Sequence, residues 1–208
     1  MRDYGFQDVV MVWAIAAFSV GIASAVFGNA WRYGILFAQG ALDFFLVLPK
    51  PVLLHVIVSR MSVTAWGDVL FGAVLYLGLV RPSPGTFALF LLLSVAATAI
   101  FISYGVAVNA LAFWLGNAEG LARECLSALL IFSTYPSTLF TGAVKVLLFT
   151  AVPAGFVAYV PVELLHEWSW PRAAALVVAA VLAVVASTTV FYAGLGRYES
   201  GNLLAMRA

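Results

Sequence analysis

The 208-residue sequence is too apolar and too poor in charge for an ordinary water-soluble domain. Hydrophobic residues make up 64% of it and charged residues 9%, against roughly a quarter charged in a typical soluble domain. The net charge of +1 gives no electrostatic argument for a nucleic-acid partner. The single cysteine, Cys125, excludes a disulfide framework and a multi-thiolate metal site. These numbers predict an integral membrane protein that crosses the bilayer several times.

The first half of the chain predicts three membrane-spanning helices, since each needs about 20 mainly apolar residues. These helices cover residues 9–28, 61–80 and 86–114. A loop of mixed polarity, residues 29–60, separates the first two. Residues 81–85, Arg-Pro-Ser-Pro-Gly, predict a tight turn between the second and third, because two prolines and a glycine do not continue a helix.

The second half predicts a helix at 121–135 and a last span at 173–195. The region 121–161 is long enough for two crossings, or for one crossing and a re-entrant hairpin. With a cytoplasmic 29–60 loop, one net crossing places six bases inside and three outside, whereas two crossings give five and four. Cytoplasmic loops are enriched in Lys and Arg, so we expect the re-entrant arrangement and a cytoplasmic C-terminus. The inner bases are Arg32, Lys50, Arg60, Arg123, Arg197 and Arg207, and the outer ones are Arg2, Arg81 and Arg172.

Residues 40–51 predict a short helix at the membrane interface. Apolar residues at 42, 44, 45, 46 and 48 accompany Asp43 and Lys50, and Pro49 stops the helix. Two interpretations are open: a cytoplasmic docking element for a partner protein, or an ordinary interfacial helix that anchors the loop. The candidate docking residues are Leu42, Asp43, Leu46, Pro49 and Lys50.

A helix break is predicted at Tyr135-Pro136, among hydroxyl side chains that can satisfy freed backbone groups. It is either a broken helix that lines a translocation path or a plain proline kink. Lys145 lies between apolar runs, either as a functional intramembrane lysine or as one that snorkels to a nearby surface. Pro153 marks a second break. The candidate pathway residues are therefore Tyr135, Pro136, Lys145 and Pro153.

No catalytic motif is visible in the sequence. Glu163, His166 and Glu167 share a helix face, but a metal site would need a ligand from another segment, which favours a solvated amphipathic cap. A nucleophile elbow and a phosphate loop are both missing from the sequence, so we expect no cofactor and no enzymatic activity in this chain. Small residues recur every four positions in the last span and predict close contact with another helix. They are Ala175, Ala179, Ala183 and Ser187.

Three segments resemble the permease subunits of type-2 ATP-binding-cassette (ABC) exporters, in their bacterial branch. Gly40-x-Leu42-Asp43, with Leu46 and Pro49-Lys-Pro51, resembles the cytoplasmic loop before the third helix. The ordered series from Phe132 to Glu163, which includes Tyr135-Pro136, Lys145 and Pro153, resembles the fifth helix and the re-entrant region. The end of the chain resembles the carboxyl-terminal signature of the branch, with Tyr198, Glu199, Gly201 and Asn202.

The resemblance implies an all-α polytopic membrane protein in a bacterial inner membrane, with a docking role for the loop around Asp43. It implies a second permease, in a homo- or heterodimer, and an ABC ATPase subunit that binds ATP and Mg. Relatives have six helices. We expect about five here plus the hairpin at about 137–161, with the first helix missing, in a single domain of residues 1–208 that also contacts lipids. Two alternatives remain: a membrane scaffold or assembly protein, and a membrane-embedded lipid-modifying enzyme.

Overall fold

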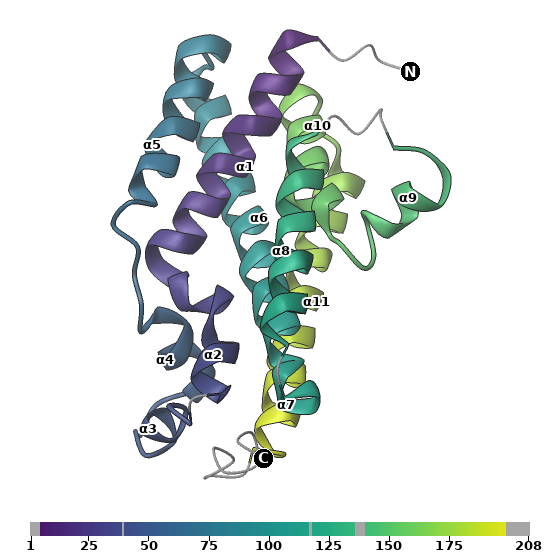
Figure 1. Cartoon of the computed structure of the whole chain (residues 1–208). Helices are drawn as coiled ribbons and strands as arrows, with labels where there is room; N and C mark the ends of the chain where they lie inside the picture. Colours follow the sequence, from purple (N-terminus) through teal and green to yellow (C-terminus); the bar gives the residue numbers. More distant parts are fainter. Residues whose placement is uncertain (1–4, 39, 117, 136–139, 199–208) are drawn as a thin grey trace.

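Long helices run side by side along one axis and form an elongated bundle (Figure 1). The computed structural model describes residues 5–38, 40–116, 118–135 and 140–198, and within these ranges the regular elements are all helical. The helices that run along the axis are α1 (Phe6–Phe27), α5 (Trp66–Leu75), α6 (Pro84–Ala110), α8 (Glu119–Thr134) and α11 (Trp170–Leu195).

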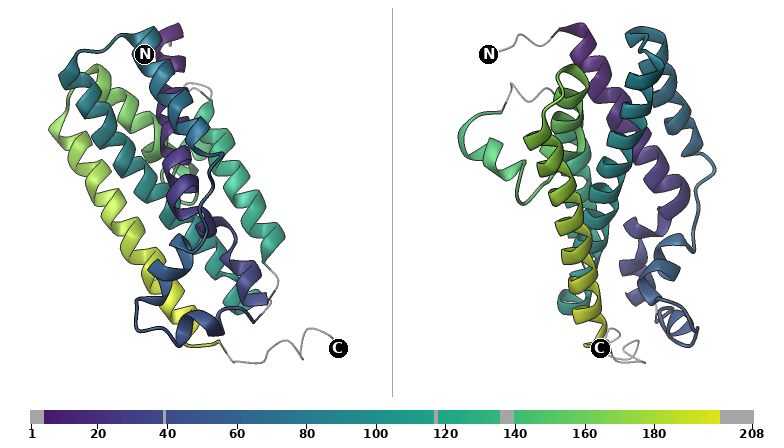
Figure 2. Two further views of the ribbon diagram at one scale, coloured as in Figure 1. Left: turned by 90° about the vertical axis from the view of Figure 1, so that its left-hand side faces the viewer. Right: turned by 180° about the vertical axis from the view of Figure 1, so that it is seen from behind.

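Short elements gather at the ends and on one side of the bundle. At the lower end in Figure 1 lie η1 (Gly28–Trp31), α2 (Tyr33–Ala38), α3 (Asp43–Leu46), α4 (Val52–Val58) and α7 (Ala112–Leu115). On the upper half lie α9 (Gly142–Leu147), η4 (Gly155–Tyr159) and α10 (Val160–His166), and α9 protrudes beside the bundle in Figure 1 and in the right-hand view of Figure 2. We call the lower end the docking end, for reasons given below.

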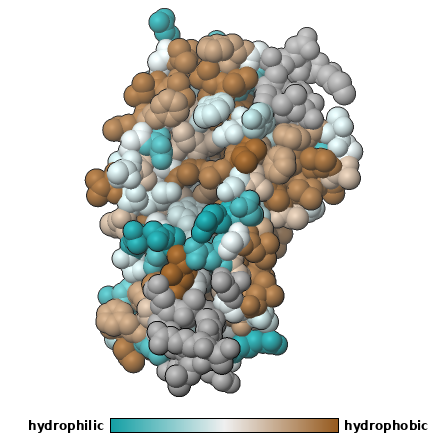
Figure 3. Space-filling model, viewed as in Figure 1, coloured by the Kyte–Doolittle hydropathy of each residue, from teal (hydrophilic) through white to brown (hydrophobic). Residues whose placement is uncertain are grey.

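Within the described ranges, three helical segments are long and apolar enough to cross a membrane: Phe6–Leu36, Pro84–Leu115 and Trp170–Leu195. Trp66–Val80, which joins α5 to the π-helical η2 (Tyr76–Val80), and Gly155–His166 are shorter apolar helices. Hydrophobic surface covers much of the upper half of the molecule (Figure 3). The predicted all-α polytopic membrane fold is therefore confirmed.

Two predicted boundaries are wrong in detail. The second span was expected from Met61, but α5 begins at Trp66. The turn was expected to extend through Gly85, but α6 already begins at Pro84. Ser83 caps α6, since its hydroxyl accepts the Thr86 N–H at 3.2 Å. Proline suits the first helical position because its missing N–H would have no partner there.

Between the start of α8 and the start of α11, the chain crosses the length of the bundle once. In Figure 1, α8 rises from the docking end, and α11 begins at the upper end and descends to it. The Tyr159 hydroxyl in η4 donates to the Phe132 carbonyl in the last turns of α8. The imidazole of His166, at the end of α10, contacts the carboxylate of Asp8 in the first turn of α1. The segment between α8 and α11 therefore turns back and returns to the upper end.

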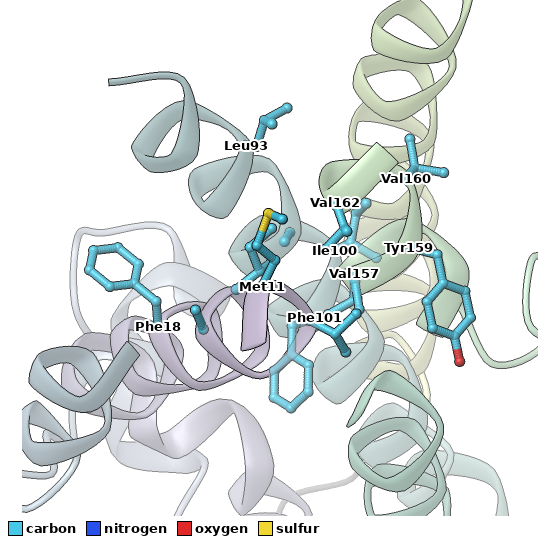
Figure 4. Close-up of a cluster of buried hydrophobic side chains, with 14 of the residues drawn as sticks. Met11, Phe18, Leu93, Ile100, Phe101, Val157, Tyr159, Val160 and Val162 are labelled. Atoms are coloured by element: carbon cyan, nitrogen blue, oxygen red, sulfur yellow. The ribbon is translucent and has the colours of Figure 1, made fainter. Parts of the chain in front are cut away.

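The core lies where α1, α6, η4 and α10 meet. Figure 4 shows Met11 of α1 near Ile100 of α6 and Val157 of η4. Phe18 points to the other side of α1, where its ring packs edge-on against Phe90 of α6 with centroids 5.2 Å apart. Burying each such side chain stabilises the fold by roughly 1.5–3 kcal/mol in water, and by close packing where lipid replaces water. This cluster holds α6 at the centre of the molecule, between α1 and α11.

Buried hydroxyl groups join α1 to α6 within this core. The Ser19 hydroxyl donates to the Ser94 carbonyl at 3.3 Å, and the Thr98 hydroxyl donates to the Ser19 carbonyl at 3.2 Å. On the other side of α6, the small residues of the last span line a groove of about 630 Å³ between α6 and α11. α11 packs against α6, but the small residues predicted to make a close helix contact line the open groove beside it, and Ala175 is exposed.

Glycines let α1 and α5 approach closely. A Cβ at Gly72 of α5 would lie 2.6 Å from the Ala14 carbonyl oxygen and 2.7 Å from the Phe18 amide nitrogen of α1. Because both are backbone atoms, they cannot move aside as a flexible side chain would. Gly67, one and a half turns earlier in the same helix, has nothing within 4 Å of its Cβ position.

We expect Gly72→Ala to destabilise the protein by about 1–3 kcal/mol, because the added methyl overpacks the α1–α5 contact. Gly67→Ala is the matched control and should leave stability unchanged or raise it by up to about 1 kcal/mol, since alanine favours the helix. Thermal unfolding of the purified protein in detergent measures both. Equal effects of the two substitutions would contradict the proposed close packing.

Candidate docking site

A single helical turn at the docking end presents an apolar edge. This turn, α3, is shorter than the helix predicted around residues 42–48 and covers Asp43–Leu46. Leu42 and Phe45 point inward and are 0% and 8% exposed. Phe44 and Val47 point outward and are 65% and 80% exposed. The turn therefore has a buried anchoring side and an exposed apolar side.

Leu46, 41% exposed, belongs to the outer side of the turn, whereas the predicted docking residue Leu42 belongs to its anchor. Pro49 and Lys50 follow as an exposed connection to α4. Phe44 and Val47 were not among the predicted docking residues. All residues from Phe44 to Leu48 are apolar, so composition carries no signal that separates the outward-facing ones from the anchors.

The anchor of the turn rests on α4, and α4 rests on the end of the first span. The Phe45 ring packs edge-on against the His55 ring, with centroids 5.3 Å apart. The Asn29 side-chain amide donates to the Val56 carbonyl at 3.1 Å and to the Ser59 hydroxyl at 2.9 Å. Asn29 is 6% exposed, so these bonds are shielded from water and correspondingly costly to break.

The end of the first span is tied in turn to α6. The Asn109 side-chain amide donates to the Ala30 carbonyl at 3.3 Å and to the Gly105 carbonyl of its own helix at 3.0 Å. The Tyr33 hydroxyl donates to the Val106 carbonyl. The docking turn is thereby connected to the central helix through α4 and η1.

A second connection runs from the docking turn to the end of α11. Tyr198, just beyond α11, has its pKa raised to about 12 by burial and then by a hydrogen bond to Asp43 and the negative charge of that carboxylate. The sequence placed Asp43 in the docking loop and Tyr198 in the carboxyl-terminal signature without relating them. The structure brings them together. Glu199, Gly201 and Asn202 of the signature lie outside the described residues.

The predicted pathway residues occupy separate elements. Tyr135 ends α8 in an extended conformation (φ −92°, ψ 147°), which the following proline favours. Pro136 itself lies outside the described residues. Lys145 is exposed on α9, and Pro153 lies in the turn before η4. No hydrogen bond or ion pair joins Tyr135, Lys145 and Pro153 in the part of the chain that the structure describes.

Two of the predicted cap residues near position 165 contact side chains of other segments. His166 contacts Asp8, and the Glu163 carboxylate lies 3.4 Å from the Arg172 guanidinium. Across the described ranges no group of three or more His, Cys, Asp or Glu side chains is placed to hold a metal ion.

Comparison with known proteins identifies the class and then the family. The apolar helices and the helical bundle define a multi-pass membrane protein. The sequence model of the family described as "ABC-2 family transporter protein" matches residues 1–201, and the chain belongs to this family. A search of curated proteins and a search of solved structures each found no match. The chain is thus the membrane permease component of an ABC transporter, and membership implies association with an ABC ATPase subunit.

We expect Tyr198→Phe and Asp43→Asn to lower thermal stability, because the first removes the phenol hydroxyl and the second removes the carboxylate charge of this contact. A double-mutant cycle should give a coupling of about 0.5–1.5 kcal/mol. Tyr192→Phe, at an exposed tyrosine of α11 near its end, is the matched control and should have no effect. Strictly additive effects of the two substitutions would contradict the contact.

The same contact predicts a pH dependence at alkaline pH. Folding raises the pKa of Tyr198 above its ordinary value, so the folded state holds the phenol proton more tightly than the unfolded state. The resulting stability is complete below pH 10 and is lost as the pH rises through about 12. Chemical unfolding between pH 9 and 12 should therefore show a steeper loss of stability in the wild type than in Tyr198→Phe.

Proposed function

We propose that this chain is the permease subunit of an ATP-driven exporter that forms the translocation path with a second permease. Separate cytoplasmic ATPase subunits, which bind ATP and Mg, would supply the energy. The observation that carries the proposal is the docking turn, with Phe44 and Val47 exposed beyond the end of the first span and Leu42 and Phe45 locked inside. An exposed apolar edge on a rigid anchor is typical of a protein interaction site.

Two sets of contacts connect the docking turn to the membrane-spanning helices, so a movement of the turn would be transmitted to them. One passes through α4 and Asn29 to the end of the first span, and from there through Tyr33 and Asn109 to α6. The other passes through Asp43 and Tyr198 to the end of α11. A partner that binds two positions of this turn with different affinity would shift the permease between two arrangements of its helices.

The distribution of bases supports a cytoplasmic docking end. Among described residues, five bases belong to segments at the docking end in Figure 1 and three, Arg81, Lys145 and Arg172, belong to segments on the other half. The asymmetry supports a cytoplasmic C-terminus in a bacterial inner membrane. It also supports residues 137–161 as a re-entrant region within one permease domain of residues 1–208. The five bases are Arg32, Lys50, Arg60, Arg123 and Arg197.

Copurification tests the proposal. Gentle solubilisation of the native membrane and affinity isolation of the chain should recover a second polypeptide that contains an ABC ATPase phosphate loop. Finding the chain alone would support the scaffold or assembly interpretation instead. A second copy or a different permease in the same complex distinguishes a homodimer from a heterodimer.

We expect Phe44→Ser combined with Val47→Ser to reduce ATPase recovery about tenfold or more. Each fully buried apolar side chain contributes about 1.5–3 kcal/mol, and every 1.4 kcal/mol is roughly a tenfold change in affinity. Val146→Ser, at a 63% exposed valine on α9, is the control. The docking role fails if the double variant inserts into the membrane and recovers as much ATPase as the control.

A further inference from the structure

A cavity of about 430 Å³ lies between α1, η1, α6 and α8, apart from the docking turn. Its lining is charged at one end and apolar at the other. The charged end contains Arg32, Glu119 and Arg123, and the apolar end contains Val20, Phe101 and Leu130.

The order of these residues along the helices gives the cavity a direction. α1 descends toward the docking end and α8 rises from it (Figure 1), so Arg32 and Glu119 both lie nearer that end than Val20 and Leu130 do. Glu119 and Leu130 lie eleven positions apart in the single helix α8, which is roughly 16 Å at a rise of about 1.5 Å per residue. The apolar part borders two candidate membrane spans, Phe6–Leu36 and Pro84–Leu115.

The charged end holds more positive than negative charge. The Arg123 guanidinium lies 2.8 Å from the Glu119 carboxylate, but their side chains are 69% and 51% exposed, so the pair is weak. Arg32 is exposed and forms no ion pair within the described ranges. Two guanidinium groups and one carboxylate leave a net charge of +1. Guanidinium groups bind phosphate oxygens in a bidentate manner.

The apolar wall is already in place. The Trp31 ring packs edge-on against Phe101, with centroids 4.7 Å apart. The same ring lies against Gly105 of α6, where a Cβ would be 2.7 Å from two of its atoms. This wall is therefore fixed by the packing of η1 on α6 and needs no rearrangement to contact a ligand.

We propose that this cavity binds an anionic phospholipid of the leaflet on the docking side. The phosphate-bearing headgroup lies against Arg32 and Arg123, and one acyl chain runs along Val20, Phe101 and Leu130. A wholly apolar ligand would leave Arg32 without an ion-pair partner, and a small free anion would leave the apolar slot without a partner. The site is independent of the direction of transport and of the ATPase contact at Phe44 and Val47.

Lipid binding to the purified chain in neutral detergent tests the site. Native mass spectrometry should show that dioctanoyl phosphatidylglycerol binds at least tenfold more tightly than dioctanoyl phosphatidylcholine. Arg32→Gln combined with Arg123→Gln should abolish this preference, since both charge-assisted contacts are lost. Arg60→Gln, an exposed arginine at the same end that does not line the cavity, is the matched control and should retain it.

Two further experiments separate the contribution of the lipid acyl chain from that of the headgroup. Leu130→Trp narrows the apolar end while both arginines remain, and it should weaken phosphatidylglycerol binding although the charge is unchanged. Glycerol 1-phosphate, which has the anionic group without an acyl chain, should not compete. Equal binding of the two lipids, an equal loss in Arg60→Gln, or effective competition by glycerol 1-phosphate would each overturn the proposal. ATPase recovery, measured separately, is unaffected by any of these results.

Discussion

Hydrogen bonds to main-chain carbonyl groups fix the point where the first span stops being an α-helix. At η1 the regular helix gives way to a tighter turn, and Asn29, Tyr33 and Asn109 bind carbonyl oxygens of Val56, Val106 and Ala30 around it. In an environment without water, polar backbone groups need partners from within the protein. These side chains supply them and set the position of everything attached to η1, which includes α4, the docking turn and one wall of the lipid cavity.

The central helix α6 contacts the other elements that position the docking turn. It contacts α1 through Ser94 and Thr98, holds η1 through Asn109, and packs on α11 across the groove lined by small residues. The end of α11 then returns to the docking turn through Tyr198 and Asp43. The docking turn is therefore held from two sides, so it cannot move without displacing both the first span and the last.

The sequence predicts the spans well because apolar runs of sufficient length have one stable solution in a bilayer. Their ends depend on local capping, and the Ser83–Pro84 start of α6 shows how a proline that suggests a turn can open a helix. The docking residues are harder to predict from the sequence, because Leu42 and Phe44 are both apolar. The packing of the turn against His55 and α4 of the same chain decides which of them is buried. The Asp43–Tyr198 contact and the Arg32–Arg123 cavity join segments far apart in the chain, for which a single sequence carries no signal.

The length of the docking turn bears on its two interpretations. An interfacial anchor stabilises a loop by burying an apolar helix face in the lipid headgroup region, and its strength grows with the apolar area buried there. The turn α3 has four residues, and two of the apolar side chains around it, Leu42 and Phe45, already point into the protein. What remains for a second surface is a compact edge of Phe44, Leu46 and Val47, held rigidly by its own anchor. A small, rigid apolar edge is poorly suited to fluid lipid and well suited to a shaped pocket on a protein, which favours docking over anchoring.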